Sequence, residues 1–313
     1  GMTAIVYIVI LGALLAFVGG SVARAIWYAR CPIHLRWELY PVPHEDPRRV
    51  RHGGSYFEEG NWWSQPTRFS LVGEVRFMVP EILFLKGLWE FNRALWVRSF
   101  PFHFGLYLLI GTIGLLVVAV LLGRLAPTLM AAGLGMGLHW LYTVTGFSGL
   151  VLAIIGAAAL LIQRLTAENL KTYTAPGDIF NLCWFFAAFG CLLVGFLLRG
   201  SDSPSSVALV RAVLTFDTSL RIPNLLAVGL VLSALLAAYI PFTHMSHFIG
   251  KYFTYHSVRW NDRPLRPGDR MGKKLAEYLM YKPTWAARHV GADGTKTWAE
   301  VATTNPAEAE KKK

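Results

Sequence analysis

The sequence predicts an all-α membrane protein, a polytopic bundle of five transmembrane helices, and two observations carry this prediction. Hydrophobic residues make up 54% of the 313 residues, and charged residues only 16%. Several runs without charge reach the roughly 20 residues that a helix needs to cross a hydrocarbon core about 30 Å thick. A soluble globular protein does not need such runs, so we expect the chain to lie in a membrane.

The predicted spans follow from these apolar runs in chain order. They are residues 2–22, 100–122, 134–162, 179–198 and 225–249. The first run has no Lys or Arg before it and is followed by Arg24, Arg30 and Arg36. A cleaved signal peptide carries its positive charges in front of the apolar run, so we expect a retained anchor with its N-terminus outside.

The spans divide the chain into four predicted regions. These are the first transmembrane helix (1–24), a cytoplasmic loop that contains an amphipathic helix (25–98), a four-helix membrane core (99–250) and a basic cytoplasmic tail (251–313).

The amphipathic helix is expected over residues 79–97, with Ile82, Leu85 and Trp89 on one face. Its charges are too many for a membrane span, so it lies on the membrane surface, against a partner, or against the protein's own helices. Small residues recur in the core at 133–137 (GLGMG) and 145–149 (TGFSG), where we expect close helix approach.

The orientation follows from the distribution of Lys and Arg. These residues number ten in 25–98, two between the third and fourth spans, and thirteen from Lys251 onward. The two loops on the other side hold one and three. Cytoplasmic loops carry the excess of positive charge, so the tail is predicted to be cytoplasmic. The net charge of +11 then indicates topology and contact with anionic lipid or a partner. No nucleic-acid-binding motif accompanies it, so no nucleic-acid partner is expected.

Two histidines at the same predicted depth are the main candidate ligands. His103 lies just inside the second span, and His247 lies just before the end of the fifth. Ionisable rings in membrane helices are costly, and neutral imidazole is a common iron ligand. Two such rings on antiparallel helices suit the opposite faces of one haem. The alternative is that each ring is only a hydrogen-bonding group.

Two further histidines are weaker candidates. His244 lies one turn deeper than His247 and is the alternative ligand or a hydrogen-bonding partner of the haem edge. His139 has no other histidine at its level in any span, so we expect it to make an interhelical hydrogen bond with Tyr142, Thr143 or a neighbour. A proton or quinone contact is the alternative role for His139.

The chain itself is not expected to carry an iron–sulfur cluster. Its three cysteines, Cys31, Cys183 and Cys191, form no CxxC pair. Two of them lie within one apolar helix, where cysteine commonly packs as a small hydrophobic residue. Any iron–sulfur centre that exchanges electrons with this chain therefore belongs to a partner.

Residues 100–260 resemble the respiratory nitrate reductase gamma subunit superfamily. The resemblance rests on the five-span order, on FHFGL at the start of the second span, and on Pro241 and Phe242 followed by His247. This superfamily includes the cytochrome b subunits of heterodisulfide-reductase-like and sulfite-reduction-associated membrane complexes. The long aromatic loop before the second span is more similar to those complexes. The resemblance implies a multi-pass protein of a bacterial or archaeal cytoplasmic membrane.

The resemblance also implies how many haems to expect. The nitrate reductase subunit binds a second, outer haem through histidines on its second and fifth spans. The matching positions here are Ile113 and Gly229, and neither residue can ligate iron. We therefore expect one haem b, on the cytoplasmic side, with Arg98 and Lys251 placed to meet its propionates.

The function implied is electron transfer between a quinone pool and a cytoplasmic iron–sulfur or flavin oxidoreductase. That partner is expected to dock on the loop, through residues such as Trp62 and Trp63, and on the basic tail. The quinone is expected near the second and fifth spans, with His244 as its proton partner. The alternative is a redox-inactive membrane anchor for such a complex. Pure transport ranks third, because the spans lack broken helices and buried charge pairs.

Overall fold

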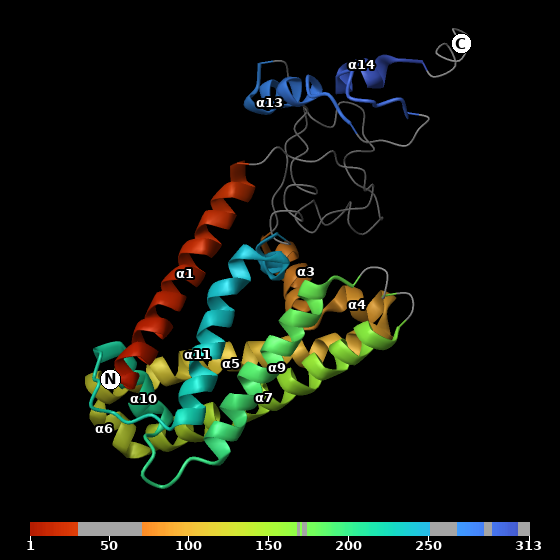
Figure 1. The fold of residues 1–313 in the computed structure, drawn as a ribbon. Coiled ribbons are helices and arrows are strands. Elements are labelled where there is room, and N and C mark those ends of the chain that lie inside the picture. The colour runs from red at the N-terminus through yellow and green to blue at the C-terminus, as the bar shows by residue number, and fades with distance from the viewer. Residues whose placement is uncertain (31–70, 168–169, 171–173, 251–267, 285–289, 306–313) are drawn as a thin grey trace. The chain divides into compact units, whose positions relative to one another are not determined.

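A computed structural model provides the structure of the chain, and it describes residues 1–30, 71–167, 170, 174–250, 268–284 and 290–305 (Figure 1). Within these ranges the secondary structure is helical and contains no strand, so the predicted all-α class is confirmed there. The chain divides into two compact units. The first comprises residues 1–24 and 74–248, and the second comprises residues 25–73 and 249–313. Each unit is described separately below.

The described residues include five helices that are long and apolar enough to cross a membrane. They are α1 (Met2–Arg30), α5 (Arg93–Leu125), the run Pro127–Thr166, α9 (Pro176–Leu197) and Asn224–Phe242. Each contains or overlaps one predicted span, so the expected number of helices of membrane length is confirmed within the described residues. The first three extend beyond their predicted limits at one or both ends.

The fifth span ends earlier than predicted. Its α-helix, α11, covers Asn224–Tyr239, and two short 3-10 turns follow, η4 (Ile240–Phe242) and η5 (His244–Ser246). Between the turns Thr243 is extended, with φ −123° and ψ 178°. Pro241 explains the break, because proline lacks the N–H that an α-helix needs and its ring clashes with the preceding turn. The expected continuous helix to residue 249 is therefore wrong in its last turns.

The single amphipathic helix predicted before the second span is also wrong in detail. The chain forms α3 (Leu71–Leu83), α4 (Lys86–Phe91) and then α5, with the left-handed residue Leu85 between the first two. Asn92 separates α4 from α5, and its side chain accepts a hydrogen bond from the backbone N–H of Leu95 at 3.0 Å. An Asn that caps a helix in this way is a strong start signal.

Two side chains of α5 hydrogen-bond backbone carbonyl groups at the end of α3 and directly after it, and so hold that segment against α5. Trp96 Nε1 donates to the carbonyl oxygen of Phe84 at 2.7 Å, and Tyr107 Oη donates to that of Ile82 at 2.8 Å. Of the three placements left open for this segment, packing against the protein's own helices is therefore observed.

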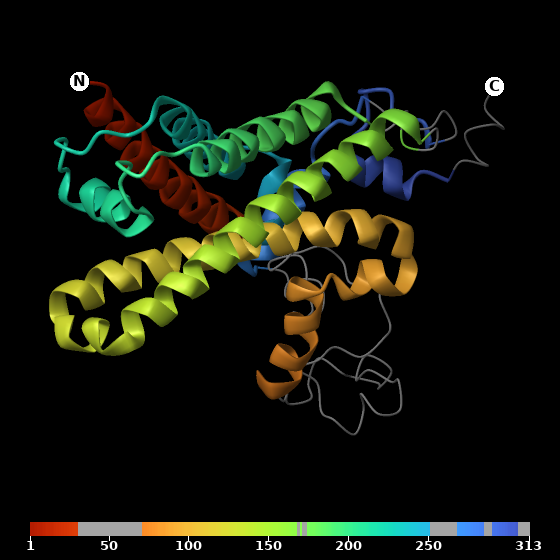
Figure 2. The same ribbon diagram turned by 90° about the horizontal axis from the view of Figure 1, so that it is seen from below.

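Helix α5 packs along α7 (Gly135–Thr166), and Figure 2 shows them side by side in antiparallel directions. A Cβ added at Gly105 would collide with the backbone of Ala153, and one at Gly156 would collide with the backbone of Phe102. Glycine therefore allows the two backbones to touch, as is common in membrane helix packing. This contact fixes the position of α5 along α7 at Phe102, the residue directly before His103.

The two small-residue motifs behave differently. Gly149 of TGFSG lies against Gly105 and Leu109 of α5, which confirms the expected close approach. In GLGMG, a Cβ at Gly133 or Gly137 would meet nothing within 4 Å, so that motif is not a helix contact. Gly133 instead has φ 105°, a left-handed conformation that glycine adopts readily, at the kink before α7.

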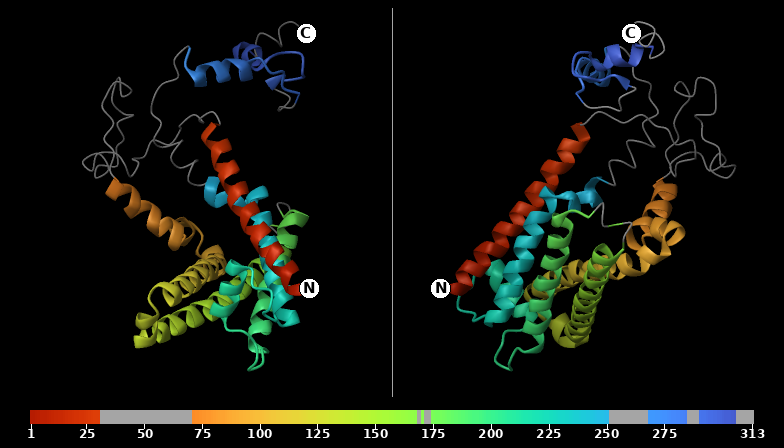
Figure 3. Two further views of the ribbon diagram at one scale, coloured as in Figure 1. Left: turned by 90° about the vertical axis from the view of Figure 1, so that its left-hand side faces the viewer. Right: turned by 45° about the vertical axis from the view of Figure 1, so that its right-hand side comes forward.

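Two apolar clusters form the interior of the first unit. One joins α5, α7, α9 and α11 around Phe102, Phe185 and Leu236. The other joins α1, α11 and the short helix α10 (Ser206–Thr215) around Tyr7 and its neighbours. Figure 3 shows α1 alongside α11, so the first span belongs to the same bundle as the predicted four-helix core.

The second unit contains two short described helices, α13 (Arg270–Leu279) and α14 (Trp298–Thr303). Thr297 and Glu300 form a capping box at the start of α14, in which each residue accepts the other's backbone N–H. The Trp298 N–H also donates to the carbonyl oxygen of Tyr281 at 2.9 Å, which ties α14 to the segment after α13.

Candidate functional site

His103 is anchored by the turn of α5 that precedes it. Its Nδ1 lies 2.8 Å from the carbonyl oxygen of Ser99 and 3.2 Å from the Ser99 hydroxyl, and Ser99 is buried. A carbonyl oxygen can only accept, so Nδ1 carries the proton and donates it. The other ring nitrogen, Nε2, then has the lone pair that can ligate a metal. Metal-bound histidines typically make this backbone contact.

The structure brings His247 beside His103. The ring centroids lie 6.1 Å apart, with an angle of 68° between the ring planes. His247 directly follows the η5 turn, and its backbone N–H donates to the carbonyl oxygen of His244. Of the two histidines considered for this position, it is therefore His247 and not His244 whose ring meets His103.

The separation of the two rings fits a shared metal. A metal–imidazole bond of about 2.0–2.1 Å on each side implies ring centroids about 6.3 Å apart, close to the observed distance. No cluster of three or more His, Cys, Asp or Glu side chains with metal-binding geometry occurs in the part of the chain that the structure describes. A haem needs only two protein ligands because its porphyrin supplies the others. The residues present thus fit a haem iron by number, type and spacing.

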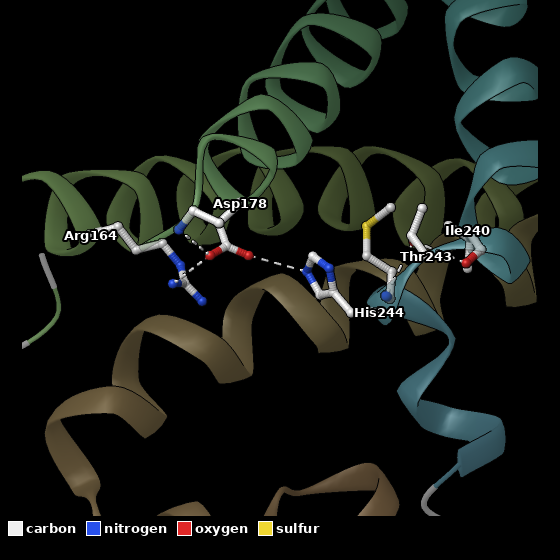
Figure 4. Close-up of polar contacts among 7 residues, drawn as sticks. Arg164, Asp178, Ile240, Thr243 and His244 are labelled. Carbon is white, nitrogen blue, oxygen red and sulfur yellow. Dashed lines mark hydrogen bonds and ion pairs between the residues drawn. The ribbon is translucent and has the colours of Figure 1, made fainter. Parts of the chain in front are cut away.

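Side chains from three elements, α7, α9 and η5, form a charged cluster that includes His244 of the same turn (Figure 4). Asp178 lies in the first turn of α9. Its Oδ1 is 3.2 Å from Nε2 of His244, and its Oδ2 is 3.2 Å from Nη1 of Arg164. Its Oδ2 also accepts the backbone N–H of Ala175 at 3.0 Å. The Asp178 side chain is only 14% exposed. Such a carboxylate needs partners, and three donors surround it.

Arg24 of α1 forms a second polar contact at the same segment. Its Nε and Nη2 donate to the carbonyl oxygen of Pro241 at 3.1 and 3.0 Å. Pro241 is fully buried, and the helix packs closely there because Gly20 has no side chain. The segment that carries His244 and His247 is therefore contacted from both α1 and α9.

Sequence reasoning did not identify Asp178, Arg164 or Arg24 as site residues. A signal was present, since Arg164 ends one apolar run and Asp178 begins the next, so opposite charges flank a short loop. Nothing in the local sequence shows that Asp178 meets His244 or that Arg24 meets Pro241, because those partners are distant in the chain.

The remaining predicted site residues are placed as follows. Arg98 donates through Nη1 to the carbonyl oxygen of Ala94 at 2.6 Å, within its own helix. His139 hydrogen-bonds Tyr142 Oη at 2.8 Å, so the predicted partner is confirmed, but the bond lies within α7 and the expected interhelical contact is wrong. Lys251 and the loop tryptophans Trp62 and Trp63 lie outside the described residues.

The positions where a second histidine pair would be needed are not suited to a ligand. Ile113 is 61% exposed on α5. Gly229 lies where α11 touches α9, and a Cβ there would be 2.7 Å from the backbone nitrogen of Leu192. A larger side chain at residue 229 would push the two helices apart.

The fold and the site define a class of protein. Within the described residues it is an all-helical protein with five helices of membrane length and a histidine pair formed by the second of them and the segment that follows the fifth. No family model, curated protein or solved structure matches the chain. The function is therefore inferred from the site itself.

Proposed function

We propose that this protein is a membrane cytochrome b subunit that passes electrons between a quinone and an oxidoreductase partner through one bis-histidine haem b. The observation that supports this proposal most is the 6.1 Å separation of the His103 and His247 rings. The two rings come from helices distant in the chain, so local sequence does not account for their meeting. When bound, the haem supplies one-electron transfer.

The chain's own residues have three roles in this proposal. His103 and His247 would hold the haem iron. Ser99 fixes the ring of His103 through its carbonyl oxygen, so that Nε2 is the coordinating nitrogen. His244, whose side chain is 65% exposed while Asp178 holds its Nε2, exchanges a proton with the quinone through Nδ1.

The proposal places the site at the cytoplasmic side of a bacterial or archaeal inner membrane. Positive charge in 25–98 and in the tail supports an outside N-terminus and a cytoplasmic C-terminus. An iron–sulfur or flavin subunit docks on those two regions. One haem is proposed, which agrees with the exposure of Ile113 and the tight packing at Gly229.

The resemblance to the nitrate reductase gamma subunit superfamily agrees with this proposal but does not carry it. The second candidate function is a redox-inactive anchor for the same kind of complex. It is favoured by the Ser99 contact, since a histidine that already has a hydrogen-bond partner can serve structure alone.

A reduced-minus-oxidised visible spectrum of the purified protein decides between the two functions. A b-type spectrum with one haem per chain supports the proposal, and its loss in His103→Ala assigns the ligand. The matched control is His139→Ala, since His139 has its own partner in Tyr142. A protein purified from haem-sufficient cells without such a spectrum would be the anchor.

A further inference from the structure

The position of His247 does not follow from the helix that precedes it. α11 ends at Tyr239, and Thr243 is extended between two short turns. A residue after such a break has no continuous ladder of helix hydrogen bonds to fix its direction. His247 therefore depends on what holds the segment from Pro241 to His247, called the ligand turn below.

The ligand turn is held at its start by Arg24. Two guanidinium N–H groups converge on the single carbonyl oxygen of Pro241 at 3.1 and 3.0 Å. Gly20, one turn earlier on α1, makes this approach possible, because a Cβ there would lie 2.9 Å from Cβ of Pro241. Hydrogen bonds from a charged donor are stronger than neutral ones.

Asp178 holds the ligand turn at His244, three residues before His247. The carboxylate lies 3.2 Å from Nε2 of His244, while Arg164 holds the other oxygen of the same carboxylate. The carbonyl oxygen of His244 in turn accepts the backbone N–H of His247. Between the two contacts, Ser246 is buried and its hydroxyl donates to the carbonyl oxygen of Thr243 at 2.8 Å.

We propose that Arg24 and Asp178 are positioning residues that hold the ligand turn from two sides and so keep His247 opposite His103. Neither residue touches the proposed iron. The contact between Arg24 and Pro241 means that the first span, which lies outside the predicted four-helix core, takes part in building the site. The consequence at the haem rests on the proposed function, whereas the consequence for the turn does not.

The first experiment measures how well the backbone amides of the ligand turn are protected from exchange, and it does not depend on haem. Hydrogen exchange of the peptide that contains the ligand turn is followed by mass spectrometry in the full-length protein, both as purified and in a His103→Ala background. Arg24→Met, which keeps an unbranched apolar stem but removes the donors, and Asp178→Ala should each speed exchange about tenfold, because each removes a charge-assisted hydrogen bond.

Conservative variants and matched controls separate these contacts from general damage. Arg24→Lys keeps one charged donor and Asp178→Asn keeps an oxygen acceptor, so both should restore most of the protection. Arg124→Met, at the exposed end of α5, and Asp202→Ala, on an exposed loop, should leave exchange of the ligand turn unchanged.

The second experiment measures the spectrum and the midpoint potential of the haem, which depend on how His247 is oriented. In the haem-loaded protein, Arg24→Met and Asp178→Ala should shift the midpoint potential and weaken the low-spin bis-histidine signature, since ligand orientation tunes both. Arg24→Lys should restore them.

The possible results either support or overturn the proposal. Unchanged exchange in both Arg24→Met and Asp178→Ala overturns it. Faster exchange with an unchanged haem spectrum and potential also overturns it, because the turn would then be held without positioning the ligand. If the protein binds no haem, the proposed function fails, and the exchange experiment in His103→Ala still tests whether the turn is held from two sides.

Discussion

His103 Nδ1 donates a hydrogen bond to the carbonyl oxygen of Ser99 at 2.8 Å, one turn earlier in the same helix. This contact assigns the proton of the imidazole and leaves Nε2 as the nitrogen for coordination. The ring of His247 lies beside it, with the centroids 6.1 Å apart.

Replacing either ring of the pair should remove the haem. We expect His103→Ala and His247→Ala each to abolish b-type absorbance, because a bis-histidine iron loses an axial ligand in both variants. His244→Ala should retain the absorbance, since its ring faces Asp178 and not His103. A reduced-minus-oxidised spectrum of each purified variant provides the measurement. Retention in His247→Ala together with loss in His244→Ala would reverse the ligand assignment.

The two cations that were predicted to meet the haem propionates should raise the haem potential. Arg98 lies one turn before His103, and Lys251 follows His247 by four residues in sequence. Removing a positive charge favours the oxidised iron, so Arg98→Gln and Lys251→Gln should each lower the midpoint potential. Arg124→Gln, at the other end of α5, is the control. Redox titrations that do not change in either variant would remove both cations from the site.

Adding a methyl group at the α5–α7 contact should lower the stability of the bundle. Gly156→Ala places a methyl group against the backbone of Phe102, so we expect it to destabilise the bundle by about 1–3 kcal/mol. Gly111→Ala makes the same chemical change in α5, where a Cβ would meet nothing within 4 Å. That control should be neutral or slightly stabilising, because alanine is the better helix former. Thermal unfolding in detergent measures both, and equal melting temperatures would show that the contact is not tight.

A single haem near one boundary should separate little charge across the membrane. One such centre does not conduct electrons across a hydrocarbon core of about 30 Å, so the quinone has to react on the same side. Turnover of the complex in sealed vesicles should therefore give little response from a potential-sensitive dye. A large potential would indicate a second cofactor or a quinone site on the other side. An ionophore added at the end of the trace provides the calibration.

The start of α14 should be sensitive to acid. The backbone N–H and hydroxyl of Thr297 hydrogen-bond the Glu300 carboxylate and lower its pKa. A lowered folded-state pKa stabilises this cap above the ordinary pKa of glutamate, and the stabilisation is lost as the pH falls through the lowered value. We expect protection of the α14 amides, corrected for intrinsic exchange rates, to decline over that window. Glu300→Ala should show low protection at every pH.

The composition and the lengths of the apolar runs were enough to predict the helical class and the five membrane-length helices. Both are local properties, because a helix satisfies its own backbone hydrogen bonds and a run of about 20 apolar residues sets its length. The positions of His103 and His247 near the ends of their runs were visible for the same reason. Gly149 was also identified as a packing residue from its small neighbours.

Only the tertiary structure decided how the site is held. Pro241 marks a break in the fifth span, and the turn after it is contacted by Arg24 and Asp178, which lie on other helices. The tertiary structure places His244 against the Asp178 carboxylate and the ring of His247 beside that of His103. Contacts between distant segments leave no periodic pattern in the sequence, so the apolar runs predicted the helices while the packing of α1, α5, α9 and α11 determined which side chains meet.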